Sequence, residues 1–111
     1  MNLVNTNPFP ISLKTGHGKI TLPKTTLDVR VVTNQVPVSE TSEGVSIAKA
    51  SNPRIVGLPQ KKDGTGYVTN LAVYYASKIE GRDDCYAFNA EAEGTVRNEK
   101  GQIEIYGGLL S

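Results

Sequence analysis

The longest regular pattern of apolar and polar positions lies near the carboxyl-terminal end of the sequence. Apolar or small residues alternate with polar residues through residues 85–97, and the alternation resumes over residues 102–107. A period of two places alternate side chains on opposite faces of a half-buried strand. The pattern therefore predicts a β-hairpin with strands at 85–97 and 102–107 and a turn at Asn98-Glu99-Lys100-Gly101.

A second hairpin is predicted over residues 10–23. Ile11 and Leu13 alternate with polar residues before a short segment that contains Gly16 and Gly18, and the same alternation follows that segment. Two alternating runs separated by a glycine-bearing turn are typical of a β-hairpin, since glycine readily adopts the positive φ angles of tight turns.

The remaining segments predict shorter elements separated by turns. In chain order these are an extended arm at 1–9, a strand at 25–33, a loop at 34–44, a strand at 45–50, a short extended piece at 54–58 and a polar turn region at 60–66. The loop prediction depends on Pro37 and on a run of Ser, Glu and Thr residues. A loop of that length is often functional or mobile.

Residues 67–79 allow two interpretations. A helix would align a stripe of apolar residues at Val68, Leu71, Ala72, Tyr75 and Ile79. A strand suits the Tyr and Val content, because these side chains lose rotamer freedom in a helix and fit a pleated surface. Gly66, just before the segment, is a poor helix cap. We therefore predict a strand.

Together these elements predict a mainly β protein. The expected architecture is a small antiparallel sandwich or partly open barrel of about six to eight strands with a C-terminal meander. The 111 residues fit one domain, which we expect to be a single β domain over residues 10–111 preceded by the arm at 1–9.

Charge is distributed unevenly along the chain although the net charge is only +1. Residues 1–62 carry eight Lys or Arg and three Asp or Glu, whereas residues 63–111 carry four and eight. This asymmetry is compatible with a basic binding face, with complementary surfaces in an oligomer, or with two halves that interleave on folding.

The single cysteine, Cys85, allows no intrachain disulfide and favours a reducing compartment. The sequence shows neither a signal peptide nor an apolar run long enough to span a membrane. We therefore expect a cytoplasmic protein without a membrane partner, and a phage or virion context fits the same observations.

Few residues are suited to catalysis or metal binding. His17 lies between glycines at a predicted hairpin tip, where nothing would orient an imidazole as a general base. Cys85 follows two aspartates, which would oppose formation of a thiolate. The acidic residues nearby are Asp83, Asp84, Glu91 and Glu93, and alternate acids on an exposed sheet face are commonplace. We expect no cofactor, no metal and no catalytic residues.

Nucleic-acid binding is the alternative that the basic residues suggest. They are Lys14, Lys19, Lys24, Arg30, Lys49, Arg54, Lys61 and Lys62. A small β-barrel of the oligonucleotide-binding kind combines a basic groove with aromatic platforms. Most of the aromatic residues, however, lie in the acidic half and are needed to fill a core without tryptophan.

The sequence thus favours a non-catalytic binding or structural module that associates with itself or with another protein. Long strands that leave an unpaired edge and the apolar end Leu109-Leu110 support this expectation. A small single-stranded nucleic-acid-binding β-barrel is the alternative, and an enzyme that uses carboxylates is a third.

Overall fold

The computed structural model describes residues 1–50 and 53–111, and the protein is mainly β. Strands account for 46% of the residues and a single helix for 8%. The strands form several small sheets, none of which closes into a barrel in the described part of the chain. The predicted class, mainly β with a partly open sandwich, is confirmed. Residues 1–50 and 53–111 contain twelve strands in place of six to eight, because several strands contain only two or three residues.

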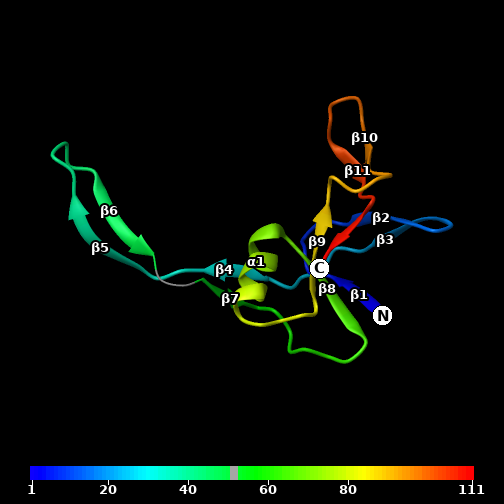
Figure 1. The fold of residues 1–111 in the computed structure, drawn as a ribbon, viewed down its shortest axis with the longest axis horizontal. Helices are drawn as coiled ribbons and strands as arrows, with labels where there is room; N and C mark the ends of the chain where they lie inside the picture. The colour runs from blue at the N-terminus through cyan, green and yellow to red at the C-terminus, as the bar shows by residue number, and fades with distance from the viewer. Residues whose placement is uncertain (51–52) are drawn as a thin grey trace.

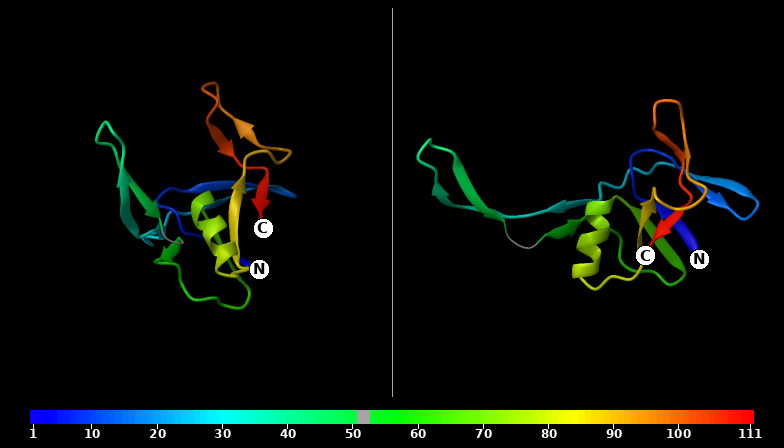
Figure 2. Two further views of the ribbon diagram at one scale, coloured as in Figure 1. Left: turned by 60° about the vertical axis from the view of Figure 1, so that its left-hand side comes forward. Right: turned by 45° about the horizontal axis from the view of Figure 1, so that its top comes forward.

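The molecule is elongated, with hairpins that project from a small body (Figure 1). Its principal extents are 59 × 39 × 23 Å and its radius of gyration is 17.4 Å. A compact domain of this size would have a radius of gyration of about 13 Å. The difference arises from the projecting hairpins, which Figure 2 shows from two further directions.

A four-stranded mixed sheet forms the centre of the body. Its order is β1 (Asn2–Asn5), β8 (Thr65–Thr69), β9 (Cys85–Asn89) and β12 (Gly108–Leu110). The ladders β1–β8 and β8–β9 are parallel, and β12 is antiparallel to β9. The connection from β8 to the parallel β9 contains the helix α1 (Leu71–Ile79), as parallel neighbours require a crossover.

The sheet is covered on both faces by different elements. The hairpin of β2 (Ile11–Thr15) and β3 (Gly18–Leu22), predicted from the sequence, covers one face. Ile11 and Leu13 of this hairpin pack against Val68 in the centre of the core. Helix α1 packs against β9, and its Ser77 lies beside the Cys85 thiol.

Residues 1–9 are extended but belong to the body. Within this N-terminal segment, β1 is an edge strand of the main sheet, and Asn5, Thr6 and Asn7 are buried. The Asn7 amide and the Thr6 hydroxyl both donate to the carbonyl of Val68, at 3.2 and 3.0 Å. Because these buried polar groups are satisfied by the end of β8, the segment is fixed to the sheet.

The strand predicted over 67–79 is wrong, because the segment divides into the end of β8 and helix α1. Asn70 caps the helix: its side-chain oxygen accepts a hydrogen bond from the amide of Val73 at 2.9 Å. Asparagine is among the best N-cap residues. This cap lies four residues after Gly66, the poor cap on which the strand prediction depends. Packing of α1 on the sheet outweighs the low helix propensity of its Tyr and Val residues.

The loop predicted over 34–44 is also wrong. It contains β5 (Gln35–Glu40), which pairs antiparallel with β6 (Ser46–Ala50) and ends in a turn closed by a hydrogen bond from the Gly44 amide to the Thr41 carbonyl. Pro37 is tolerated because it adjoins a register shift in a ribbon whose outer edges are unpaired. The predicted strand at 45–50 corresponds to β6.

A short ribbon connects this hairpin to the body. It pairs β4 (Arg30–Val32) with β7 (Arg54–Val56), and both strands contact α1. The strand predicted over 25–33 is therefore present only at residues 30–32. The short piece predicted at 54–58 contains β7.

The carboxyl-terminal hairpin is shorter than predicted. Its turn at Asn98–Gly101 is confirmed, with a hydrogen bond from the Gly101 amide to the Asn98 carbonyl at 3.0 Å. Its strands are β10 (Val96–Arg97) and β11 (Ile103–Ile105). A single strand over 85–97 is wrong, because the chain turns between β9 and β10 at Gly94, where φ is +90°. Alternation continues through that turn and conceals it.

Candidate interaction surfaces

The hairpin of β5 and β6, residues 35–50, is called the arm from here on. Every residue of both strands is exposed. The large apolar residues Val36, Val38, Val45 and Ile47 keep between 45% and 61% of their surface accessible. Val36 pairs with Lys49, so these two side chains share a face of the ribbon with Ile47, two residues from Lys49 on β6. Beyond the register shift in β5, Ser39 pairs with Ile47, and Val38 lines the same hollow as Val36. The arm therefore has an apolar face.

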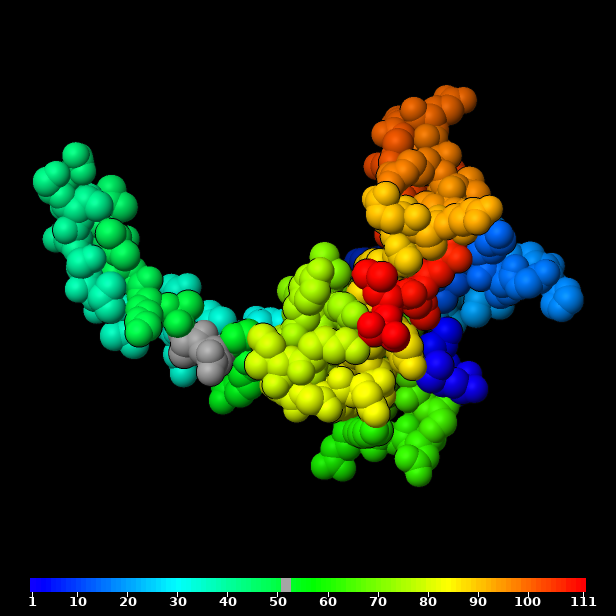
Figure 3. All heavy atoms as spheres, viewed as in Figure 1, coloured from blue at the N-terminus to red at the C-terminus, as the bar shows by residue number. Residues whose placement is uncertain are grey.

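A hollow on the arm has a volume of about 330 Å³ and is lined by Val36, Val38, Lys49 and Ala50. Apart from each other, β5 and β6 make no substantial contact with another described element. Figures 1 and 3 show the arm standing clear of the body. A lone two-stranded hairpin is marginally stable in water, and its unpaired edges can accept further strands. The arm thus has the properties of a surface that binds a partner.

Helix α1 carries a second exposed apolar surface, here called the helix stripe. It consists of Leu71, Tyr75 and Ile79, which follow one another at intervals of four residues and are 48–68% exposed. The helix buries its opposite face, formed by Val73, Tyr74, Ala76 and Ser77. The apolar stripe expected from the sequence for a helix is consequently the face that points to solvent.

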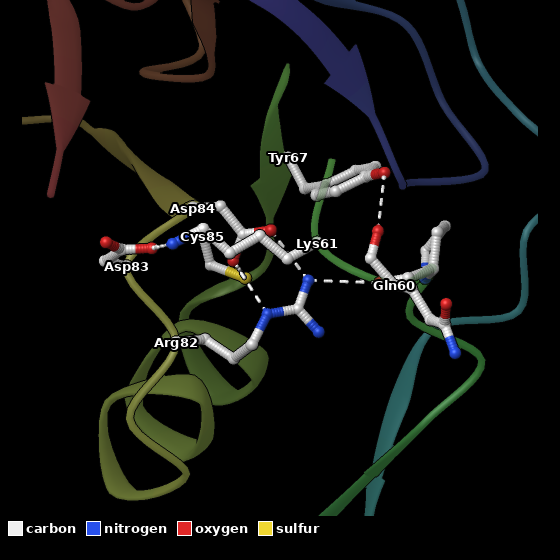
Figure 4. Close-up of polar contacts among 8 residues, drawn as sticks. Gln60, Lys61, Tyr67, Arg82, Asp83, Asp84 and Cys85 are labelled. Carbon is white, nitrogen blue, oxygen red and sulfur yellow. Dashed lines mark hydrogen bonds and ion pairs between the residues drawn. The ribbon is translucent and has the colours of Figure 1, made fainter. Parts of the chain in front are cut away.

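Polar contacts between the start of β9 and residues 59–61 form a third cluster (Figure 4). Arg82 makes two hydrogen bonds to the carboxylate of Asp84, at 2.8 and 2.7 Å, and donates a third to the carbonyl of Pro59 at 3.0 Å. Arg82 lowers the pKa of Asp84 below its usual value, and Asp84 raises the pKa of Arg82. A two-point pair of this kind fixes the orientation of both groups.

Cys85 lies next to this ion pair and is not activated as a nucleophile. The thiol is buried, and burial raises its pKa. Its sulfur lies 3.9 Å from a carboxylate oxygen of Asp84, which opposes ionisation further. Reactive cysteines have the opposite environment, partly exposed and electropositive. The cluster therefore connects chain segments and has none of the features of an activated thiol site.

Two further contacts complete the same cluster. Lys61 forms an ion pair with Asp83 and lowers the pKa of that carboxyl. The hydroxyl of Tyr67 donates to the carbonyl of Gln60 at 3.4 Å. The acids Asp83 and Asp84 are therefore each paired with a cation.

The eight basic residues proposed for nucleic-acid binding are all exposed but are distributed over different projections. Lys14 and Lys19 face each other on the hairpin β2–β3, and Lys24 follows it; Arg30 and Arg54 lie on the ribbon β4–β7; Lys49 lies on the arm; Lys61 and Lys62 lie in the loop before β8. Two of them are engaged by acids, since Arg30 pairs with Asp28 and Lys61 with Asp83.

The other residues considered for chemistry lie apart from one another. His17 is exposed in the turn between β2 and β3, where its backbone amide donates to the hydroxyl of Thr15. Glu91 and Glu93 lie in the turn after β9 and not on a strand face. The expected pairing of these two carboxylates on one strand is thus incorrect.

Sequence reasoning missed both apolar surfaces, although signals for them were present. Val36 and Val38 alternate with polar residues as strand residues do, but Pro37 between them favoured a loop. Leu71, Tyr75 and Ile79 have helical spacing, but the Tyr and Val content of residues 67–79 favours a strand.

Comparison of the chain with protein-family models, with curated proteins and with solved structures finds no match. Outside residues 51–52, no helix of the structure is long and apolar enough to cross a membrane.

Proposed function

We propose that this protein is a non-catalytic interaction module that associates with a second copy of itself through the arm. The observation that carries the proposal is the apolar face of the arm, with Val36, Val38 and Ile47 exposed and no described element covering it. Exposed contiguous apolar surface on a monomer is typical of an interaction site. A reducing setting is part of the proposal, because Cys85 is a buried free thiol.

The apolar area of the arm is sufficient for association only if two arms take part. Fully burying a Val or Ile side chain contributes about 1.5–3 kcal/mol. Because the four large side chains of the arm are about half exposed, each arm offers roughly 4 kcal/mol. Two arms offer roughly 8 kcal/mol, from which an entropic cost of association of at least about 4 kcal/mol must be subtracted. The remaining free energy, at most about 4 kcal/mol, corresponds to a weak symmetric dimer in the millimolar range.

The non-catalytic part of the proposal is supported by the titratable groups. Both aspartates with shifted pKa values, Asp83 and Asp84, are shifted downward, so neither is suited to act as a general acid near neutral pH. The pKa of Cys85 is shifted upward, which disfavours a thiolate nucleophile.

A dilution series tests self-association. Sedimentation velocity or light scattering should show a mass that rises from monomer to dimer as the concentration increases. Val38→Glu, on the apolar face of the arm, should shift this transition to at least tenfold higher concentration. The matched control is Val96→Glu, because Val96 is an exposed valine on another projecting hairpin. A strict monomer at millimolar concentration would exclude the proposal.

Binding of single-stranded nucleic acid is the competing function. Its support is the set of eight exposed basic residues, which would have to reach one strand from several projections. Titration of a labelled oligonucleotide at two salt concentrations tests it, since phosphate contacts release counterions and make affinity fall steeply with salt. Binding at low salt that is lost at high salt would favour this function over self-association.

A further inference from the structure

We infer that the helix stripe of one protomer is the surface that receives the arm of the other. The inference rests on the proposed self-association through the arm and adds the identity of the receiving surface. Each protomer then contributes both an arm and a stripe, so one two-fold axis would generate two identical contacts. A single interface of this kind would cover both exposed apolar surfaces, the arm and the helix stripe.

The spacing of side chains on the two surfaces matches. Leu71, Tyr75 and Ile79 are four residues apart, which gives about 6 Å between neighbours and about 12 Å in all at 1.5 Å rise per residue. Alternate residues along a strand are about 6.8 Å apart. Ile47 and Lys49 of β6, together with Val45 immediately before the strand, therefore span up to about 13.6 Å. Three residues of the arm can therefore lie along three residues of the stripe.

Charge gives this contact a direction. The tip of the arm carries Glu40 and Glu43, whereas Lys49 lies near its base. The first turn of α1 contains no acidic residue. Its last turn contains Lys78, whose ammonium lies over the Tyr74 ring, and Glu80 follows that turn. The carboxyl-terminal end of the helix therefore holds one cation and one anion, and it gives Lys49 no clear preference. Helix N-termini attract negative charge. The favourable orientation therefore places the acidic tip of the arm at the N-terminus of α1.

The area of the arm favours a contact that occurs twice. Five residues of a two-stranded ribbon cover a flat footprint of about 17 × 10 Å, or roughly 170 Å². Packing the two arms directly against each other would use this footprint once and leave both stripes exposed. Reciprocal docking uses it twice, roughly 340 Å² in all, and also buries the stripes. Because specific interfaces bury about 800 Å² of accessible surface per partner, the resulting dimer is expected to be weak.

The shape of the molecule allows such docking. Figure 3 shows an open hollow between the arm and the hairpin β10–β11, with atoms of α1 at its floor. The ribbon β4–β7 lies between α1 and the arm of the same chain, so that arm extends away from its own helix (Figure 1). A partner's arm can approach α1 from this side, and the residues of the stripe are 48–68% exposed.

Two single variants and their mixture test the inference. Val38→Glu damages the arm, and Ile79→Glu damages the stripe. Each alone should raise the dimer dissociation constant at least tenfold, whereas Ile20→Glu, at an exposed isoleucine of β3, should leave it unchanged. An equimolar mixture of the two variants should dimerise more tightly than either alone, because the mixed dimer retains one intact arm and one intact stripe in contact.

The outcomes separate the two proposals. If Val38→Glu is monomeric and Ile79→Glu dimerises like the wild type, self-association through the arm stands and the stripe is excluded as its receptor. The absence of any gain in the mixture also overturns the inference, since it places arm and stripe in different contacts. A wild-type protein that stays monomeric removes both proposals.

Cross-linking provides a test that does not depend on the folding of the glutamate variants. The double variant Ser39→Cys/Lys78→Cys places a thiol on the arm and another beside the stripe, and mild oxidation should produce covalent dimers. The control Ser39→Cys/Lys100→Cys, with the second thiol at the tip of the hairpin β10–β11, should not. Cys85 is buried and should not interfere. Equal cross-linking in both variants would refute the inference.

Discussion

Replacement of Arg82 by methionine should measure how strongly the ion pair at the start of β9 stabilises the fold. The arginine side chain is 21% exposed and that of Asp84 only 5%, so the pair is largely removed from water. Methionine keeps much of the apolar stem but removes all three hydrogen bonds to Asp84 and Pro59. The carboxylate would then be buried without a counter-ion.

The expected loss in free energy of unfolding is about 3 kcal/mol at pH 7. Breaking a buried ion pair by removing one partner costs about 3–5 kcal/mol, and the partial exposure of Arg82 favours the lower end. Domains of this size unfold with about 5–15 kcal/mol. With a urea dependence of about 2 kcal/mol/M, the midpoint of urea unfolding should fall by about 1.5 M.

The loss should depend on pH in a defined direction. Arg82 lowers the pKa of Asp84 in the folded protein, so the pair contributes its full stability above the unfolded pKa of about 3.9. That contribution disappears as the pH falls through the lower folded pKa. In the variant the carboxyl lacks this partner, so the difference between variant and wild type should shrink progressively below pH 4.

Urea unfolding followed by circular dichroism at pH 7 and at pH 3 provides the measurement. Lys61→Met is the control, because it breaks the exposed pair with Asp83, and exposed pairs contribute little. A loss below about 0.5 kcal/mol for Arg82→Met would refute the reasoning. An equal loss at both pH values would show that the destabilisation comes from packing and not from the charge of Asp84.

Three further predictions concern the helix, the thiol and the ribbon β4–β7. Asn70→Ala removes the N-cap and should lower the stability by about 1 kcal/mol, with a loss of helical signal, whereas Asn70→Asp should retain most of it. Cys85 should react with a thiol reagent such as dithiobis-nitrobenzoate only as fast as the protein opens, so that urea accelerates the reaction steeply; rapid labelling of the native protein would contradict its burial. Gly57→Ala would place a methyl group 2.2 Å from the carbonyl oxygen of Asp28, at a residue whose φ is +88°. The control is Gly101→Ala, where φ is +80° but no atom lies within 4 Å of the added methyl group. Gly57→Ala should therefore destabilise the protein far more than Gly101→Ala. For Gly101→Ala, only the backbone strain of about 1 kcal/mol is expected. Equal thermal shifts for the two variants would show that the close contact at Gly57 is relieved by movement of the ribbon β4–β7.

The accuracy of the sequence predictions follows the range of the interactions involved. The hairpin at 10–23 and the turn at 98–101 were predicted correctly, because alternation and turn residues act over a few neighbouring positions. The arm was missed because a proline within an alternating segment argues against a strand. Its pairing with β6 nevertheless accommodates Pro37 beside a register shift.

The sequence by itself determined that the chain is mainly β, because its apolar residues recur with a period of two and its turns are marked by glycine and proline. Only the tertiary structure decided that residues 71–79 form a helix. The parallel strands β8 and β9 require a crossover connection, and a helix that packs on the sheet satisfies its backbone hydrogen bonds within itself.

The tertiary structure also decided which apolar residues are covered. Leu71, Tyr75 and Ile79 have the spacing of a helix stripe, and Val36 and Val38 have that of a strand face. Local pattern cannot distinguish a core face from an interaction face, because both bring apolar side chains together on one side of an element. Whether an apolar face is buried depends on which elements pack against it. Those elements come from distant parts of the chain or from a second copy.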